Sequence, residues 1–162
     1  RCLQICGSQI LFDGEPFEGP VVYTGCIDEL FDYKYGRLPY RSLDFVLEKR
    51  NIQQAQPVVQ VNYPNRFAYT RTSEYKLLQK EQAPNGTILV YEYPKACVQG
   101  DIPYYPEETK ESRDCYNRYL ALADQIPHLY LSGRLAQYMY CNMDAAIDHA
   151  MQLAQKIIEK EN

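Results

Sequence analysis

The chain has 162 residues, 46% of them hydrophobic, which is enough to bury a core and is typical of one domain. Its formal net charge is −4, without a dominant basic stripe, and this argues against nucleic acid or an anionic membrane as the main partner. The longest apolar runs, such as residues 88–91, fall far short of the roughly 20 residues of a membrane-spanning helix.

The first two-thirds of the chain is predicted to be β-structure. Residues 9–12 and 21–24 are short apolar runs, and the Asp-Gly-Glu-Pro sequence at 13–16 is a turn signal between them. Further strands are predicted at residues 58–63, 68–78 and 87–93. Short turns at 64–66 and 84–86 predict that these strands pair with their neighbours in antiparallel fashion.

The last third of the chain is predicted to be mainly helical. Residues 107–125 have a helical composition that stops before a proline, and residues 129–131 form a short predicted strand. The final helix has one broad apolar arc that should pack on a sheet, made of Ala146, Ile147, Ala150, Met151, Leu153, Ala154, Ile157 and Ile158. Asn142 or Asp144 is its natural N-cap. The preceding loop therefore delivers polar groups to free N–H groups at a helix start, which suits an anion.

Few side chains in the sequence could perform acid–base or nucleophilic chemistry. The six cysteines show no CxxC spacing and only two histidines are present, so no metal site is predicted. The sequence also lacks GxSxG, P-loop and GxGxxG motifs, so any chemistry would come from a cofactor. The cysteines are interpreted as reduced thiols, which indicates a cytoplasmic protein.

Tyrosine is the compositional anomaly, with 16 residues and no tryptophan. Most of these tyrosines are interpreted as strand residues on a half-exposed sheet. Those next to arginines could instead bind a diphosphate. A phenol donates to a phosphate oxygen without adding charge, and an arginine adds a forked, charge-assisted contact. The residues that suit this role are Arg71, Tyr105, Arg134 and Tyr140.

Four long motifs follow one another in the order seen in a known family. They are VVYTGCIDELFDYKYGRLPYRSLDF at 21–45, VNYPNRFAYTRTSEYK at 61–76, YEYPKACVQGDIPYYP at 91–106 and SGRLAQYMYCNMDAAI at 132–147. On these motifs, the chain resembles the C-terminal part of bacterial UDP-galactopyranose mutases from about residue 10 onward. Four ordered motifs of this length are far more specific than a single glycine motif.

The resemblance implies an α+β fold that is a fragment of a larger α/β flavoprotein. Residues 1–25 would be strands from the end of the FAD-domain region, and residues 26–108 an antiparallel, substrate-binding sheet. Residues 109–162 would supply the C-terminal helix–strand–loop–helix of a FAD-binding domain of the glutathione-reductase type. The glycine fingerprint for the FAD pyrophosphate would then lie in a missing N-terminal half. This chain alone is therefore expected to be inactive.

The implied activity is that of an isomerase that converts UDP-galactopyranose to UDP-galactofuranose for cell-wall and lipopolysaccharide biosynthesis. The implied cofactor is FAD, active only when reduced, and much of its site would lie outside this chain. In the family's mechanism flavin N5 attacks the anomeric carbon to form a sugar adduct, UDP leaves, and the sugar re-closes on another hydroxyl. The implied partners are UDP-galactose, the missing N-terminal half and further copies of the same protein.

The resemblance also assigns roles to individual residues. Arg71, in the YTR motif, would assist the departure of UDP. The implied substrate-binding residues are Asn62, Arg71, Tyr105 and Tyr140. The implied cofactor-binding residues are Arg134, Tyr140, Asn142, Met143 and Asp144. Asn142 stands where the family often has an aspartate, which removes a charge near the flavin, and Arg37 and Arg41 match the family pattern without an assigned role.

Three other functions are compatible with these residues. A non-catalytic module would bind a sugar nucleotide through its tyrosines and arginines, and it would bind UDP without flavin. The C-terminal part of another FAD-dependent enzyme, such as an amine-oxidase-like protein, would share the last strand, loop and helix but not the IPYYP or YTR motifs. A tyrosine-rich scaffold without catalysis would tolerate the loss of Arg71.

Overall fold

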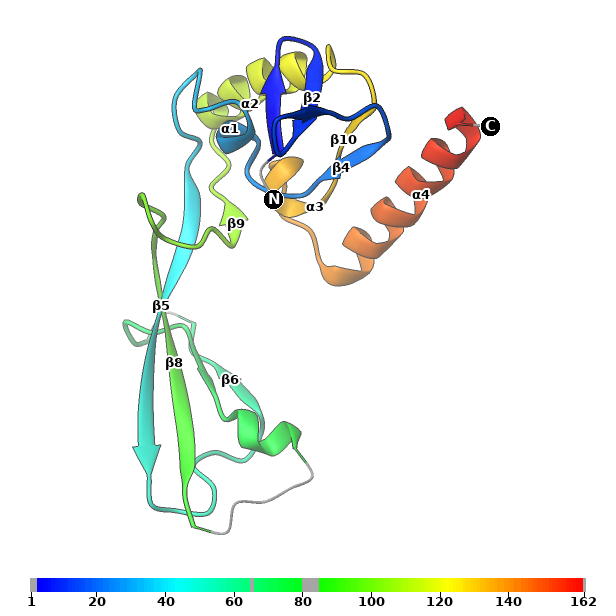
Figure 1. Ribbon diagram of the computed structural model, residues 1–162. Helices are drawn as coiled ribbons and strands as arrows, with labels where there is room; N and C mark the ends of the chain where they lie inside the picture. Colours follow the sequence, from blue (N-terminus) through cyan, green and yellow to red (C-terminus); the bar gives the residue numbers. More distant parts are fainter. Residues whose placement is uncertain (1–2, 65, 80–84, 162) are drawn as a thin grey trace. The chain divides into compact units, whose positions relative to one another are not determined.

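The computed structural model describes residues 3–64, 66–79 and 85–161, and the chain divides into two compact units (Figure 1). Unit 1 contains residues 1–41 and 103–162, and unit 2 contains residues 42–102. Unit 1 therefore combines both ends of the chain, whereas unit 2 is one continuous segment.

Unit 1 is built from short strands and helices. Its strands are β1 (Leu3–Cys6), β2 (Gln9–Phe12), β3 (Glu15–Pro16), β4 (Val21–Tyr23), β9 (Tyr105–Pro106) and β10 (Leu129–Leu131). Its helices are α1 (Ile27–Leu30), α2 (Lys110–Ala123), α3 (Gly133–Ala136) and α4 (Met143–Glu161). Strands β1, β2 and β3 form an antiparallel sheet, whereas β4 and β10 form a parallel pair in which Val21 lies opposite Leu129.

Unit 2 is mainly antiparallel sheet. Its elements are β6 (Gln60–Asn62), β7 (Arg71–Ser73), the 3₁₀ helix η1 (Tyr75–Leu78) and β8 (Thr87–Ala96). Strand β5 (Tyr40–Arg50) begins in unit 1, where it pairs with β9, and continues into unit 2 beside β8. The strand order is β6-β7-β8-β5-β9, and the β6–β7 and β7–β8 pairs are antiparallel. The mixture of helices with antiparallel sheet agrees with the predicted α+β class.

Most predicted strands are confirmed, with ends shifted by a few residues, at β2, β4, β6, β8 and β10. The strand predicted at 68–78 is wrong beyond Ser73, because η1 follows it. At this point the Glu74 carboxylate accepts the backbone N–H groups of Ala55 and Gln56, and the closest of these contacts is 2.9 Å. The antiparallel pairing predicted from the turns at 64–66 and 84–86 is observed, although Asn65 and Pro84 lie outside the described residues.

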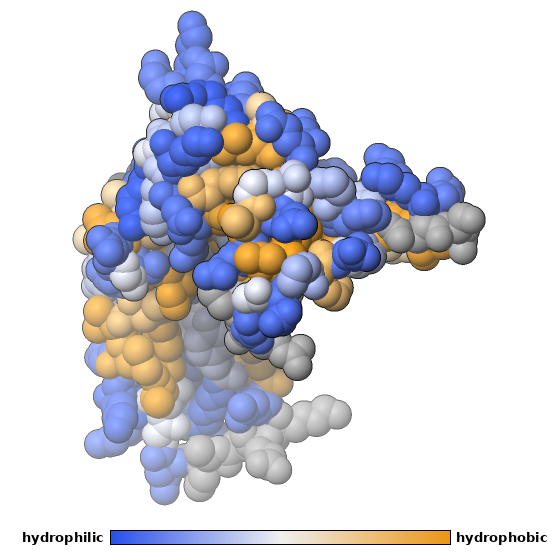
Figure 2. All heavy atoms as spheres, turned by 45° about the horizontal axis from the view of Figure 1, so that its top comes forward, coloured by the Kyte–Doolittle hydropathy of each residue, from blue (hydrophilic) through white to orange (hydrophobic). Residues whose placement is uncertain are grey.

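Strand β5 was not predicted from the sequence. Phe45, Val46 and Leu47 are consecutive apolar residues, so they lack the alternation that marks a half-buried strand. In the structure all three are exposed, and Leu47 is 62% exposed. Figure 2 shows such hydrophobic residues at the molecular surface. The sheet of unit 2 therefore carries apolar side chains that its own elements do not cover.

Helix α2 confirms the helix predicted at 107–125, within shorter bounds. It begins after Thr109, whose hydroxyl accepts the Ser112 N–H at 3.1 Å, while the Thr109 N–H donates to Ser112 Oγ at 2.9 Å. This reciprocal pair is a capping box. Residues 105–106, which precede the predicted helix, form strand β9.

Helix α4 begins at Met143, directly after Asn142, which was one of the two predicted N-caps. The predicted apolar arc of α4 is only partly buried. Leu153 and Ile157 are half-buried, whereas other members of the arc are exposed, including Met151 at 67%. None of the described helices combines the length and the hydrophobicity needed to cross a bilayer.

Four tyrosines of unit 1 are buried in its core instead of lying on a half-exposed sheet: Tyr40, Tyr116, Tyr119 and Tyr138. Tyr119 and Tyr138 are 0% exposed. Their hydroxyls find partners, as a buried phenol requires: Tyr119 donates to Gly36 O at 2.7 Å, and Tyr138 lies 2.8 Å from Pro39 O. In unit 2 the half-exposed positions are confirmed, for Tyr63, Tyr69, Tyr91 and Tyr93.

Candidate functional site

Three polar residues of unit 2 face one another across neighbouring strands. Asn62 on β6 lies opposite Arg71 on β7, and Arg71 lies opposite Glu92 on β8. Directly opposed residues of an antiparallel sheet project from the same face. The strand register therefore brings together Asn62 and Arg71, two of the predicted site residues, and adds a carboxylate to them.

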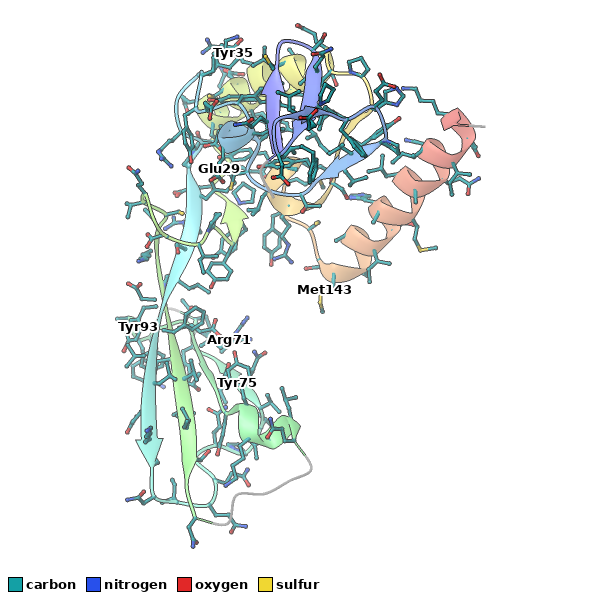
Figure 3. The ribbon with its side chains drawn as sticks, in the orientation of Figure 1. Glu29, Tyr35, Arg71, Tyr75, Tyr93 and Met143 are labelled. Carbon is teal, nitrogen blue, oxygen red and sulfur yellow. The ribbon has the colours of Figure 1, made fainter. Side chains whose placement is uncertain are left out.

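The Arg71 guanidinium is held from both sides. Its Nε donates to Asn62 Oδ1 at 3.0 Å, and its Nη1 lies 3.5 Å from Glu92 Oε2. Glu92 is 6% exposed, whereas the Arg71 side chain is 41% exposed. Figure 3 shows Arg71 on β7 in unit 2, with Tyr75 on the following η1. The cation is thus anchored by fixed neighbours and still reaches the surface, where an anion could meet it.

Glu92 was missed by the sequence predictions, although the sequence carries a signal for it. It lies between Tyr91 and Tyr93 in a strand that is otherwise mainly apolar. A carboxylate buried in a sheet needs a charged or hydrogen-bonding partner, because an unpaired buried charge is costly. Arg71 supplies that partner at 3.5 Å, and Ser73 Oγ lies at the same distance from the other carboxylate oxygen.

In unit 1, strand β9, helix α3 and the segment that follows α3 bring three predicted residues together. The rings of Tyr105 and Tyr140 meet edge to face, with their centroids 5.8 Å apart. The Arg134 guanidinium lies 5.1 Å from the Tyr140 ring centroid, and its Nε donates to Cys141 O at 2.7 Å. Tyr140 is 61% exposed. This cluster offers a phenol and a guanidinium side by side at the surface.

Arg41 joins the unit 1 cluster through the β5–β9 pair. It lies opposite Tyr105 in the register and forms an ion pair with Glu107 at 3.0 Å. Both side chains of this pair are partly exposed, so the pair itself contributes little to stability. Arg37 has a different position, stacked on the Tyr33 ring at 3.8 Å from its centroid. Of the two arginines without an assigned role, Arg41 is therefore the one in the cluster.

The start of α4 lies directly after Tyr140 and Cys141. Asn142, Met143 and Asp144 are all exposed there, and Figure 3 shows Met143 at the first turn of α4. The first N–H groups of a helix have no partner within the helix and carry partial positive charge. Such groups fit the hydrogen-bonding edge of a flavin ring. They do not replace the glycine fingerprint that holds a FAD pyrophosphate, which the sequence lacks.

The predicted site residues thus form two clusters, one in each unit. Asn62 and Arg71 lie together in unit 2, and Tyr105, Arg134 and Tyr140 lie together in unit 1 beside the start of α4. Within the described parts of the chain, no group of three or more histidine, cysteine, aspartate or glutamate side chains is placed to hold a metal ion. The chemistry available is therefore anion binding by guanidinium and phenol groups.

Comparison with known proteins connects these clusters to one family. The family model described as UDP-galactopyranose mutase matches residues 8–140. The chain is 40% identical to a UDP-galactopyranose mutase of Mycoplasma pneumoniae, over 97% of this chain and 41% of the relative. It is 35% identical to a UDP-galactopyranose mutase of Mycoplasma genitalium, over 93% of this chain and 38% of the relative.

A relative with a different sugar nucleotide in its name also matches. It is a dTDP-fucopyranose mutase of Escherichia coli, 34% identical over 87% of this chain and 38% of the relative. The chain thus spans about two-fifths of the length of the curated relatives it matches. The matched region includes both clusters up to Tyr140.

Proposed function

The chain belongs to the UDP-galactopyranose mutase family, and we propose that it is the C-terminal part of an isomerase that converts UDP-galactopyranose to UDP-galactofuranose. The relatives named after UDP-galactopyranose support this substrate. The dTDP-fucopyranose mutase supports a second candidate substrate of the same chemical class. In both cases a nucleoside diphosphate leaves a hexose and returns to it.

The observation that carries the proposal is the anchored guanidinium of Arg71. When a sugar–phosphate bond breaks, negative charge develops on the departing diphosphate, and a preorganised cation stabilises that charge. Asn62 and Glu92 fix the Arg71 guanidinium before any ligand arrives. We therefore assign Arg71 the role of assisting the departure of UDP, and Asn62 the role of binding the same substrate.

Tyr105 and Tyr140 are assigned to the same diphosphate. Their edge-to-face contact fixes one ring against the other. A phenol donates a hydrogen bond without changing the net charge of the site, so it can hold the diphosphate in both its bound and its released form.

The cofactor in this proposal is FAD, of which this chain would hold one part. Arg134, Tyr140 and the start of α4 at Asn142, Met143 and Asp144 would contact the flavin, in keeping with the exposed N–H groups there. When bound and reduced, the flavin supplies the nucleophile for the anomeric carbon. Asn142 contributes no charge, so the charged side chains assigned to the flavin would be Arg134 and Asp144.

The rest of the FAD domain is proposed to come from sequence outside this chain. Parallel strands normally occur in larger sheets that are covered on both faces. The parallel sheet of β4 and β10 has only these two strands. A cavity of about 290 Å³ lies along α4, lined by Val22, Leu153, Ile157 and other apolar residues. Further strands and helices would complete this layer. Residues 1–25 and 109–162 are assigned to the FAD domain and 26–108 to substrate binding, although residues 26–41 and 103–108 lie in unit 1.

The setting of the enzyme is also part of the proposal. It would work in the cytoplasm as a homo-oligomer and supply galactofuranose to cell-surface polysaccharide. The exposed apolar residues of α4 and β5 provide surface for contacts with the rest of the polypeptide or with further copies.

The proposal is tested by comparing the chain with the complete protein, meaning the chain together with the sequence that precedes it in its gene. With reduced FAD, the complete protein is expected to convert UDP-galactopyranose to UDP-galactofuranose, as followed by chromatography of the sugar nucleotides. The 162-residue chain alone is expected to bring no stoichiometric flavin through purification and to show no turnover, since it lacks the pyrophosphate cradle.

Three outcomes would contradict this proposal. Flavin absorbance at near-unit stoichiometry on the chain alone would show that no further cradle is needed. A complete protein that binds UDP tightly without flavin, and converts neither UDP-galactopyranose nor dTDP-fucopyranose, would instead be a non-catalytic sugar-nucleotide-binding module. A complete flavoprotein that oxidises amines would be a different FAD enzyme.

A further inference from the structure

Glu108 links the start of α2 to the segment that carries Tyr140. The Tyr140 backbone N–H donates to Glu108 Oε1 at 3.2 Å. The other oxygen of the same carboxylate accepts a hydrogen bond from Arg113 Nη2. The Glu108 and Arg113 side chains are 41% and 37% exposed, so the ion pair alone adds little stability. The Glu108 carboxylate also holds the backbone N–H of Tyr140, a residue of the candidate site.

Arg113 is itself placed by the tyrosine core of unit 1. Its guanidinium lies 5.4 Å from the Tyr116 ring centroid and 5.7 Å from that of Tyr138. These two rings stack with their centroids 5.5 Å apart, and both residues are buried. A line of contacts therefore runs from the rigid core through Arg113 and Glu108 to the backbone of Tyr140.

The chain turns sharply just before Tyr140. Tyr138 has a φ of +46°, a conformation that non-glycine residues rarely adopt. On the far side of Tyr140, Arg134 Nε holds Cys141 O at 2.7 Å. Glu108 thus holds the N–H of Tyr140 and Arg134 holds the carbonyl of the next residue, Cys141, while the Tyr140 side chain is 61% exposed.

We infer that Glu108 and Arg113 form a latch that positions the Tyr140 phenol for the diphosphate of the substrate. This inference rests on the proposed function, because it takes Tyr140 as a ligand of that diphosphate. Glu108 acts through the Tyr140 backbone, so it is a positioning residue. Its pairing with Arg113 also offsets a negative charge that would otherwise repel an incoming diphosphate.

Removing the latch in the complete enzyme tests the inference. Glu108→Ala is expected to raise KM for UDP-galactopyranose about tenfold and to change kcat less than about twofold. The Tyr140 N–H loses its charged acceptor, so the phenol is no longer positioned to bind the diphosphate. Glu108→Gln keeps an acceptor oxygen, so its KM is expected to rise less than about threefold. Asp114→Asn removes one negative charge from an exposed position of α2 and is the matched control, with both constants unchanged. Equal effects of Glu108→Ala and Asp114→Asn would overturn the latch.

Tyr140→Ala separates a failure of the latch from a failure of the proposed function. In the Tyr140→Ala background, Glu108→Ala should add no further rise in KM, since residues that act as one unit are not additive. If Tyr140→Ala raises KM and Glu108→Ala does not, the latch is overturned. If Tyr140→Ala leaves KM unchanged, the diphosphate role proposed for Tyr140 is overturned instead.

Amide hydrogen exchange in the complete protein, without substrate, tests the geometry. The Tyr140 N–H is expected to exchange about tenfold faster in Glu108→Ala than in the unaltered protein, because it loses its acceptor. Glu108→Gln is expected to keep most of the protection. Unchanged exchange in Glu108→Ala, with the unfolding midpoint also unchanged, would show that Glu108 does not hold this segment.

Discussion

Replacing Arg71 by alanine in the complete enzyme is expected to lower kcat for UDP-galactopyranose about 10²- to 10³-fold, the size of effect seen when one preorganised charge-stabilising group is lost. The loss should fall on kcat and on kcat/KM alike, because the charge that Arg71 stabilises grows as UDP departs. Steady-state kinetics with reduced enzyme measure both constants. The structural reason is that Asn62 and Glu92 hold the guanidinium in place at 3.0 and 3.5 Å.

Two further variants separate the role of Arg71 from general charge effects. Arg71→Lys keeps the charge but loses the fork that reaches Asn62 and Glu92 together, so it should recover only a small part of the activity. Arg66→Ala removes an exposed arginine from the same unit and is expected to leave turnover unchanged. If Arg71→Ala were as active as Arg66→Ala, the chain would be a scaffold in this region and Arg71 would have no part in the reaction.

Glu74→Ala is expected to destabilise unit 2 by about 3 kcal/mol, because it leaves the buried Thr87 hydroxyl and two half-buried backbone N–H groups without an acceptor. Glu74 is 0% exposed. Its carboxylate accepts the Thr87 hydroxyl at 2.6 Å and the N–H groups of Ala55 and Gln56. Urea unfolding followed by circular dichroism, with amide exchange of β7 and β8 as the local probe, measures the change. Glu48→Gln, at an exposed pair with Arg50, is the control and is expected to cost less than about 1 kcal/mol.

The same carboxylate predicts how stability depends on pH. Burial disfavours the charged form of Glu74, but the hydrogen bonds from Thr87, Ala55 and Gln56 outweigh it, and the pKa lies below the usual value for glutamate. Because the pKa is lowered on folding, the ionised Glu74 contributes fully to the free energy of unfolding at neutral pH. This contribution is lost as the pH falls below the ordinary glutamate pKa of about 4.3. The stability difference between the unaltered chain and Glu74→Gln should therefore narrow in acid. A constant difference from pH 7 to pH 3 would contradict this assignment.

Much of the fold follows from local patterns in the sequence. Strands β2, β4 and β10 and helix α2 have short apolar runs or helical composition with clear ends, and the structure confirms them. Strand β5 was missed because the consecutive apolar residues Phe45, Val46 and Leu47 do not alternate with polar residues. All three side chains are exposed in unit 2, so burial does not impose that alternation. The strand predicted to run through Tyr75 ends at Ser73. The next residue, Glu74, accepts hydrogen bonds from the backbone of Ala55 and Gln56, which are far from it in the sequence.

The sequence proposes residues for the candidate site, but it does not predict the contacts that hold them. The motifs identified Arg71, Tyr105, Arg134 and Tyr140, and the structure shows how each is held. Glu92 and Glu108 were missed, because their roles depend on strand register and on the path of the chain after α3. A carboxylate that anchors an arginine or a backbone N–H looks like any other polar residue until its partner is known.

A structure of the complete enzyme with UDP bound tests the central claim most directly. We expect the Arg71 guanidinium and the Tyr105 and Tyr140 hydroxyls to lie within hydrogen-bonding distance of oxygens of one diphosphate, beside the flavin. A diphosphate bound elsewhere, with either Arg71 or both phenols out of its reach, would contradict the account.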